Sequence, residues 1–155
     1  MKDENFKAEK ISQTETIVLN GIIEKVFPLF GAFEERKWAN GWAPQLIYPE
    51  EERIEEGTTF LTEGFDDEPT YLWRVTKYAH ADSLIQYLVS TENRYWTITV
   101  KCKAAINNCT TAEVTYTYLG LNKRGNELNK KSINRIYADR LKDWEEEINA
   151  YLAKA

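Results

Sequence analysis

Aromatic side chains with a polar atom recur at every second position in the middle of the sequence, and they are the residues best suited to recognise a small molecule. Leu, Ile and Val would fill a core more simply, whereas a buried Tyr or Trp needs a partner for its O–H or N–H group. A pocket with apolar walls and a few polar tips is typical of small-molecule sites. Unless the same rings merely fill the core, the sequence therefore predicts a ligand cavity with contacts from Phe60, Tyr71, Trp73, Tyr87, Trp96, Ile98, Tyr116 and Tyr118.

The last segment of the chain offers a cation that could face this cavity. Arg140 lies one position away from an apolar stripe that includes Tyr137 and Leu141. It could point inward and pair with an acidic ligand, or it could form a lateral salt bridge on the surface of its helix. We include Tyr137 and Arg140 among the expected ligand contacts.

The sequence lacks the usual catalytic and metal-binding patterns. Its single histidine, His80, stands in a polar turn, where an exposed side chain is expected rather than a general base. Cys102 has no histidine partner to activate it, and its spacing to Cys109 matches no common zinc pattern. There is no phosphate-binding loop, HExxH motif or nucleophile elbow. No inward His, Asp or Glu is expected on any strand, so binding is favoured over catalysis, and we expect no metal and no cofactor.

Charged runs are interpreted as solvated connections. Two acidic clusters, Glu50–Glu56 and Asp66–Glu68, fall in expected loops and lack the spacing of a calcium loop. The net charge of −5 and a pI near 5.1 argue against nucleic-acid binding. Basic residues open the last helix, where they could meet an anionic lipid headgroup, although a solvated face is favoured; they are Lys123, Arg124, Lys130, Lys131 and Arg135.

Length and cysteine usage suggest one domain in a reducing compartment. The 155 residues contain no repeat, no linker and no apolar run long enough to span a membrane. If Cys102 pairs with Val114 across a hairpin, the turn is Asn107 to Cys109. The two cysteines are then roughly 20 Å apart at ~3.3 Å per residue, too far for a disulfide. Free thiols and a polar N-terminus favour the cytoplasm.

The hydrophobic period divides the chain into three parts. After a flexible tail of about residues 1–8, we expect a strand at Thr14–Leu19, a short helix at Ile22–Phe30 capped by Asn20-Gly21 and ended or kinked at Pro28, and a second short helical piece at Phe33–Trp38. A meander of six strands should follow, at Gln45–Tyr48, Thr58–Phe65, Tyr71–Tyr78, Leu84–Ser90, Tyr95–Ile106 and Thr110–Leu119. A single long amphipathic helix, residues 126–153, completes the chain.

Trp38 and Trp42 flank Asn40-Gly41 and precede Pro44, which is the pattern of a bend. Each ring could bury a large apolar area, so packing alone justifies both. The bend should lie near the cavity mouth, where we expect Trp38 to be the one that touches a ligand.

Several motifs in this sequence resemble those of a known family. They are Glu35-Arg36-x-Trp38-Ala39-x-Gly41-Trp42-x-Pro44, Gly57-x-x-Phe60-x-Thr62, Trp73-x-Val75-Thr76-x-Tyr78, Val114-Thr115-Tyr116-Thr117 with Gly125-Asn126, and Trp144-x-x-x-Ile148-x-x-Tyr151-Leu152. Together they resemble the bacterial, polyketide cyclase-like branch of the START-like (SRPBCC) superfamily, from about Thr14 onward. The resemblance implies an α+β helix-grip fold: a seven-stranded antiparallel sheet around a long C-terminal helix, with two short helices between strands 1 and 2, all in one START-like domain over 1–155.

Members of the superfamily bind lipids, sterols, polyketides or aromatic compounds, and some catalyse cyclisation, dehydration or hydrolysis. The first hypothesis is therefore a noncatalytic carrier of a hydrophobic or aromatic small molecule. The alternative is a cyclase, dehydratase or hydrolase-like enzyme acting on a polyketide-like or aromatic substrate in the same cavity. A weaker third hypothesis is a protein-interaction module, which a large apolar patch on the outer sheet face would support. Nucleic acid and integral membrane partners are not expected, and a homodimer is left open.

Overall fold

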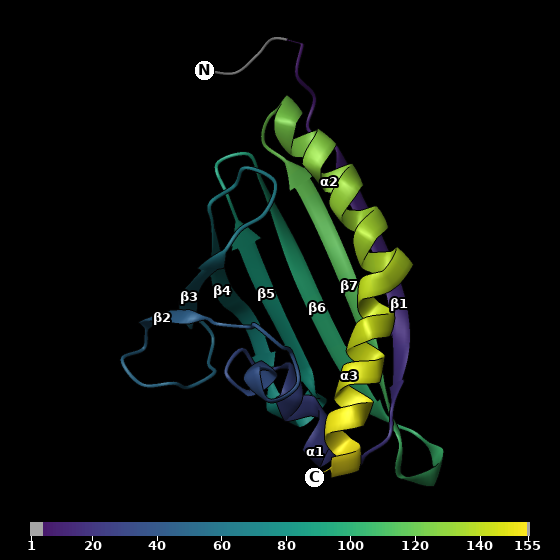
Figure 1. Ribbon diagram of the computed structural model, residues 1–155. Coiled ribbons are helices and arrows are strands. Elements are labelled where there is room, and N and C mark those ends of the chain that lie inside the picture. Colours follow the sequence, from purple (N-terminus) through teal and green to yellow (C-terminus); the bar gives the residue numbers. More distant parts are fainter. Residues whose placement is uncertain (1–4, 155) are drawn as a thin grey trace.

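A seven-stranded antiparallel sheet curves around a long C-terminal helix in the computed structural model, which describes residues 5–154 (Figure 1). The strand order is β1-β7-β6-β5-β4-β3-β2, so every neighbour except β1–β7 is consecutive in the sequence. The helix-grip architecture expected from the sequence is confirmed. The strands are β1 (Lys10–Leu19), β2 (Gln45–Tyr48), β3 (Thr59–Glu63), β4 (Thr70–Ala79), β5 (Leu84–Ser90), β6 (Arg94–Ala104) and β7 (Thr110–Gly120).

Short helices fill the connections. Between β1 and β2 lie α1 (Ile23–Val26) and the 3₁₀ turns η1 (Phe27–Phe30) and η2 (Glu34–Lys37), and two further 3₁₀ turns are η3 (His80–Asp82) and η4 (Ile106–Asn108). The expected cap at Asn20 is wrong, because α1 starts after Ile22 without a side-chain cap, and the Asn20 N–H donates to Asn149. Pro28 sits in the first turn of η1, where its missing N–H costs nothing.

The inner face of the sheet is apolar and the outer face is largely polar. Buried and partly exposed residues alternate along β5, β6 and β7, as expected for a sheet with one wet side. Val75, Val100 and Val114, from three strands, are all at most 2% exposed and lie in the main core cluster. Two positions that continue the inner side of their strands are exceptions, since Ala104 is exposed and Trp73 is only half-buried.

The β6–β7 hairpin pairs in a different register from the expected one. Cys102 lies opposite Ala112, not Val114. The loop is five residues long and contains η4, with Asn107 and Asn108 both in the left-handed region at φ 58° and 57°. Both registers place the same residues inward, so alternation cannot separate them, and the asparagines, which tolerate positive φ, decide the turn. Both cysteines are free.

The long helix begins three residues before its expected start and is not regular. It consists of α2 (Lys123–Arg135), a π-helical turn η5 (Ile136–Arg140) and α3 (Leu141–Lys154). Asn122 caps α2 by accepting a hydrogen bond from the Gly125 N–H at 2.8 Å. The start of the helix packs so closely against the β5–β6 loop that a Cβ on Gly125 would lie 1.9 Å from the Asn93 carbonyl oxygen. Gly125 is therefore required by contact rather than by backbone conformation.

The expected N-terminal tail is partly attached to this helix. Residues 1–4 of the tail lie outside the described residues. Asn126, which was expected to start the helix, instead donates to the Lys7 carbonyl at 3.0 Å and accepts from the Glu9 N–H at 3.1 Å. The part of the tail from residue 7 onward is thus fixed next to α2.

The acidic loop before β4 is not a solvated connection, because Glu68 is 4% exposed. Its carboxylate accepts hydrogen bonds from Arg94 at 2.7 and 3.0 Å and from Thr91 at 2.5 Å. The Arg94 guanidinium, itself 1% exposed, also donates to Ser132 at 2.9 Å and lies 4.6 Å from the centre of the Trp96 ring. This buried ion pair joins the β3–β4 loop to the sheet and to α2.

The same loop is held a second time, from outside. Asp66 accepts hydrogen bonds from Lys131 and Arg135 of α2, both at 3.0 Å, and these bonds lower the pKa of its carboxyl below the ordinary value. Lys130 pairs with Glu9 at 3.2 Å. The basic face of α2 thus forms ion pairs with neighbouring segments.

No helix within residues 5–154 is both long and apolar enough to cross a membrane.

Removing one partner of the buried ion pair should be costly. We expect Glu68→Leu to lower the free energy of unfolding by about 3–5 kcal/mol, because Arg94 is left charged and unpaired in the interior. The double variant Glu68→Leu/Arg94→Met should recover most of this loss, since it leaves no buried charge. Urea titrations of both variants measure the difference.

The exposed pair Arg36–Glu52 provides the control. Glu52→Leu should change stability by at most about 1 kcal/mol. Equal losses for Glu68→Leu and Glu52→Leu would contradict a structural role for the buried pair.

Candidate ligand-binding cavity

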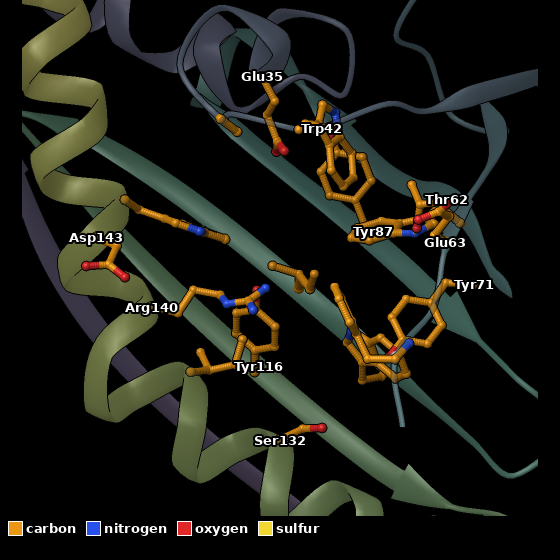
Figure 2. Close-up of a pocket in the computed structure, with 18 of the residues that line it drawn as sticks. Glu35, Trp42, Thr62, Glu63, Tyr71, Tyr87, Tyr116, Ser132, Arg140 and Asp143 are labelled. Carbon is orange, nitrogen blue, oxygen red and sulfur yellow. Dashed lines mark hydrogen bonds between the residues drawn. The ribbon is translucent and has the colours of Figure 1, made fainter. Parts of the chain in front are cut away.

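A cavity of about 720 Å³ lies between the inner face of the sheet, the long helix and the segment that joins η2 to β2 (Figure 2). Its floor is formed by strands β4 to β7, and one wall by η5 and the first turn of α3. Exposed residues of the lining mark its mouth, which lies between the η2–β2 segment, the end of β3 and α3: Asn40, Gly41, Ala43, Gln45, Glu63, Phe65, Asp143 and Glu147.

All but two of the residues expected to contact a ligand line this cavity. They are Trp38, Tyr71, Trp73, Tyr87, Trp96, Ile98, Tyr116, Tyr118 and Arg140. Phe60 does not, because it is fully buried behind Trp73, against which it stacks at 5.4 Å between ring centres. Tyr137 does not either, because it lies on the side of the helix that faces β1 and β7. Its hydroxyl donates to the Gln13 carbonyl and accepts from the Tyr116 N–H at 3.0 Å.

The aromatic rings pack on one another along the floor and leave the space above them open. Tyr71 meets Trp96 edge-on at 5.0 Å, Trp96 stacks on Tyr118 at 5.4 Å, and Tyr118 stacks on Tyr116 at 6.0 Å. Such contacts stabilise an array of rings beyond their buried area. The array therefore lines the cavity and does not fill it.

Several polar tips around the cavity are used to hold the walls. The Tyr87 hydroxyl donates to the Phe30 carbonyl at 2.7 Å, and the Trp38 indole N–H donates to the Leu29 carbonyl at 2.8 Å. The Trp73 indole N–H donates to Thr62 at 2.9 Å. The indole N–H of Trp42 donates to the Ala32 carbonyl at 2.6 Å, so the bend at Trp38 and Trp42 is fixed by both rings. These groups have no donor left for a ligand.

Two tyrosine hydroxyls remain available. Tyr116 is 4% and Tyr118 2% exposed as whole residues, both line the cavity, and neither hydroxyl has a hydrogen-bond partner within residues 5–154. Burial raises the pKa of both phenols well above the ordinary value. They therefore stay neutral at physiological pH and can donate a hydrogen bond into the cavity.

Arg140 points into the cavity from η5 (Figure 2). The lateral salt bridge that was one alternative for it is not formed, because no carboxylate of the described residues lies within 4 Å of its guanidinium. Its positive charge opposes the effect of burial by lowering the pKa of Tyr116 and Tyr118. The π-turn that carries Arg140 is a feature found often at functional sites.

Glu35 is a cavity residue that sequence reasoning missed. It extends from η2 into the space opposite Arg140 (Figure 2). Its neighbours Arg36 and Lys37 pair with Glu52 and Glu34, both at 2.5 Å, so neither neutralises it. Burial without a cationic partner raises the pKa of the Glu35 carboxyl well above the ordinary value. The available signal was its position three residues before Trp38, which places both on one side of a 3₁₀ turn.

The fold is shared with solved structures of distant sequence. Norcoclaurine synthase from Thalictrum flavum, in complex with dopamine and hydroxybenzaldehyde, gives a TM-score of 0.69 at 10% identity, over 95% of this chain and 88% of that chain. A protein from Rhizobium leguminosarum gives 0.64 at 16% identity, over 96% and 98%. Ara h 8.0201 gives 0.62 at 15% identity, over 96% and 100%. No protein-family model and no curated protein matches the sequence. These likenesses show the helix-grip fold alone.

Neutralising Glu35 should stabilise the protein at neutral pH. Since the pKa of Glu35 is raised in the folded state, its contribution to stability is fully present below the unfolded pKa of about 4.3 and is lost as pH rises through the folded pKa. We expect Glu35→Gln to have a higher Tm than the wild type at pH 7.5 and the same Tm near pH 4. Thermal unfolding at both pH values measures this difference.

Glu34→Gln is the matched control, because Glu34 is half-exposed and already paired with Lys37. It should show no gain in Tm at pH 7.5. An equal or lower Tm of Glu35→Gln at that pH would show that the carboxyl is not buried in the way described.

Proposed function

We propose that the protein binds or carries a hydrophobic or aromatic small molecule in the cavity between the sheet and the C-terminal helix. The observation that carries this proposal is the cavity itself, with about 720 Å³ of space and an aromatic floor that includes two tyrosines whose hydroxyls have no hydrogen-bond partner among the described residues. The hydroxyls of Tyr116 and Tyr118 are therefore free to form hydrogen bonds with water or with a ligand in the cavity. The proposed contacts are the sequence-predicted residues that line it, together with Glu35.

The solved structures support an aromatic ligand. Norcoclaurine synthase, which has the same fold, is seen in complex with dopamine and hydroxybenzaldehyde, both of which are aromatic. The motifs around Trp38, Trp73 and Trp144 further suggest a single START-like domain of the bacterial polyketide cyclase-like branch, and lipids remain a second ligand class within it. The free thiols Cys102 and Cys109 suit the cytoplasm as the working compartment.

Catalysis in the same cavity is the second candidate, and Glu35 is the observation that favours it. A carboxyl whose pKa is raised by burial is suited to general acid–base chemistry near neutral pH. With Arg140 and the tyrosine hydroxyls it could act on a polyketide-like or aromatic substrate, as a cyclase, dehydratase or hydrolase-like enzyme would. Binding is favoured because it requires only the cavity, whereas catalysis also requires a substrate placed against Glu35.

Native mass spectrometry of protein purified from its own host tests the binding proposal. We expect a copurified small molecule on the wild type. Ile98→Trp should lose it, because Ile98 lines the cavity floor and the larger ring occupies that space.

Thr97→Trp is the control for this substitution, because Thr97 is the neighbouring residue of β6 on the outer face. It should keep the copurified molecule. If Ile98→Trp retained the molecule and Thr97→Trp lost it, the molecule would be bound on the outer face of the sheet and not in the cavity.

A further inference from the structure

The charged groups around the cavity are either paired, exposed at its mouth, or directed into it without a partner. Arg94 is neutralised by Glu68 and Arg135 by Asp66. The carboxylates of Glu63, Asp143 and Glu147 lie at the mouth on exposed residues, where water solvates them. Within the part of the chain that the structure describes, Glu35 and Arg140 are therefore the charged residues that reach into the cavity without an ion-pair partner.

These two groups do not satisfy each other. Glu35 comes from η2 and Arg140 from η5, and no ion pair joins them. The segments that carry them are joined by the edge-on contact of Trp38, which directly follows η2, with Trp144 of α3 at 5.9 Å between ring centres. Figure 2 shows both side chains extending into the same space from opposite sides. The two polar groups are thus separate ends of one aromatic cavity.

The Arg140 end is composed of donors. The positive charge of Arg140 lowers the pKa of both Tyr116 and Tyr118 and so partly offsets the larger rise caused by burial. Both residues line the cavity, and neither hydroxyl has a hydrogen-bond partner among the described residues. A cation next to two neutral hydroxyls that can donate is suited to an anionic oxygen, most simply a carboxylate.

The Glu35 end calls for a different group. Tyr87 and Tyr116 are the titratable residues whose charges interact with Glu35, and the Tyr87 hydroxyl is already used by Phe30. No cation of the protein balances the Glu35 carboxylate, so burial favours its protonated form, which can both donate and accept a hydrogen bond. A hydroxyl or carbonyl oxygen fits this end, and a second carboxylate does not.

We propose that the ligand is a hydrophobic or aromatic carboxylic acid with a hydroxyl or carbonyl oxygen at its far end. Its carboxylate pairs with Arg140 beside Tyr116 and Tyr118, its far oxygen is hydrogen-bonded to Glu35, and its apolar body lies on the aromatic rings between them. This assignment rests on the proposed binding function and specifies the ligand class for that same cavity.

A set of naphthalene probes that differ only in their polar ends tests the assignment by isothermal titration calorimetry. 6-Hydroxy-2-naphthoic acid carries both ends, 2-naphthoic acid only the carboxylate, and 2-naphthol only the hydroxyl. The two-ended probe should bind the wild type most tightly, and the carboxylate should improve the Kd by about 10- to 100-fold over 2-naphthol, the range expected for a charge-assisted hydrogen bond.

Substitutions should remove these increments one at a time. Arg140→Met should abolish the tighter binding of the two acids and leave the Kd of 2-naphthol within about twofold of the wild-type value. Arg140→Lys should keep part of the preference for the acids. Glu35→Met should abolish the gain in affinity of 6-hydroxy-2-naphthoic acid over 2-naphthoic acid and leave the Kd of 2-naphthoic acid unchanged. Glu35→Gln should restore that gain, because its amide can still hydrogen-bond. Lys142→Met, which removes an exposed cation next to η5, is the control for net charge and should change no Kd.

The uncharged probe N-phenyl-1-naphthylamine separates this inference from the binding proposal on which it rests. The two-ended ligand is refuted, and the cavity proposal stands, under two conditions. N-phenyl-1-naphthylamine binds the wild type but not Ile98→Trp, and the three naphthalene probes bind the wild type with equal affinity or not at all. If none of the four probes binds, the cavity proposal itself fails. Loss of the carboxylate preference in Lys142→Met as strongly as in Arg140→Met would also refute the role of Arg140.

Discussion

A single helix is too narrow to cover the apolar face of a seven-stranded sheet, and the rest of this structure follows from that mismatch. The long helix packs against β1 and β7 at one side of the sheet, so the inner face of β4, β5 and β6 needs another cover. The short segment from α1 to β2 covers part of it, from the opposite side. Aromatic side chains rise from the remaining floor, but they stack along it instead of closing the space. The cavity is therefore a consequence of the architecture, and its chemistry is set by the side chains that border it.

The central strands could be predicted from the sequence because their buried and partly exposed residues alternate. Alternation of apolar and polar residues fixed the extent of β5 to the residue and that of β7 to within one residue at its C-terminal end. Features that depend on a single contact could not be predicted in the same way. The β6–β7 register differs from the expected one by two residues because two consecutive asparagines take positive φ, and the alternation of apolar and polar residues is the same in both registers. The helix starts three residues before the expected position because Asn122 caps it, and this contact is not visible in the hydrophobic period.

The same distinction explains which site residues could be predicted. Tyr116, Tyr118 and Trp96 were found because the pleat of a strand fixes the direction of every side chain. Phe60 follows the same pleat but lies behind Trp73. A residue on the inner face of the sheet therefore does not always reach the surface of the cavity. The environments of Glu35 and Glu68 depend on residues far away in the sequence. Glu68 is buried because it pairs with Arg94, whereas Glu35 lies in the cavity without a cationic partner. A run of charges in a loop gives no indication of which member will be buried.

The cavity combines walls that are held by internal hydrogen bonds with polar groups that have no partner in the protein. A binding site requires both. Trp38, Trp73 and Tyr87 each use their polar atom on the protein, so the rings are fixed before a ligand arrives. The Arg94–Glu68 pair holds the β3–β4 loop to the sheet and α2 in the same way. A preformed wall reduces the ordering cost of association. Glu35, Arg140, Tyr116 and Tyr118, by contrast, leave interactions unmade in a low-dielectric cavity, where such groups destabilise the fold. A ligand that satisfies them binds the folded chain alone, and so it stabilises the protein through the same groups that weaken it when the cavity is empty.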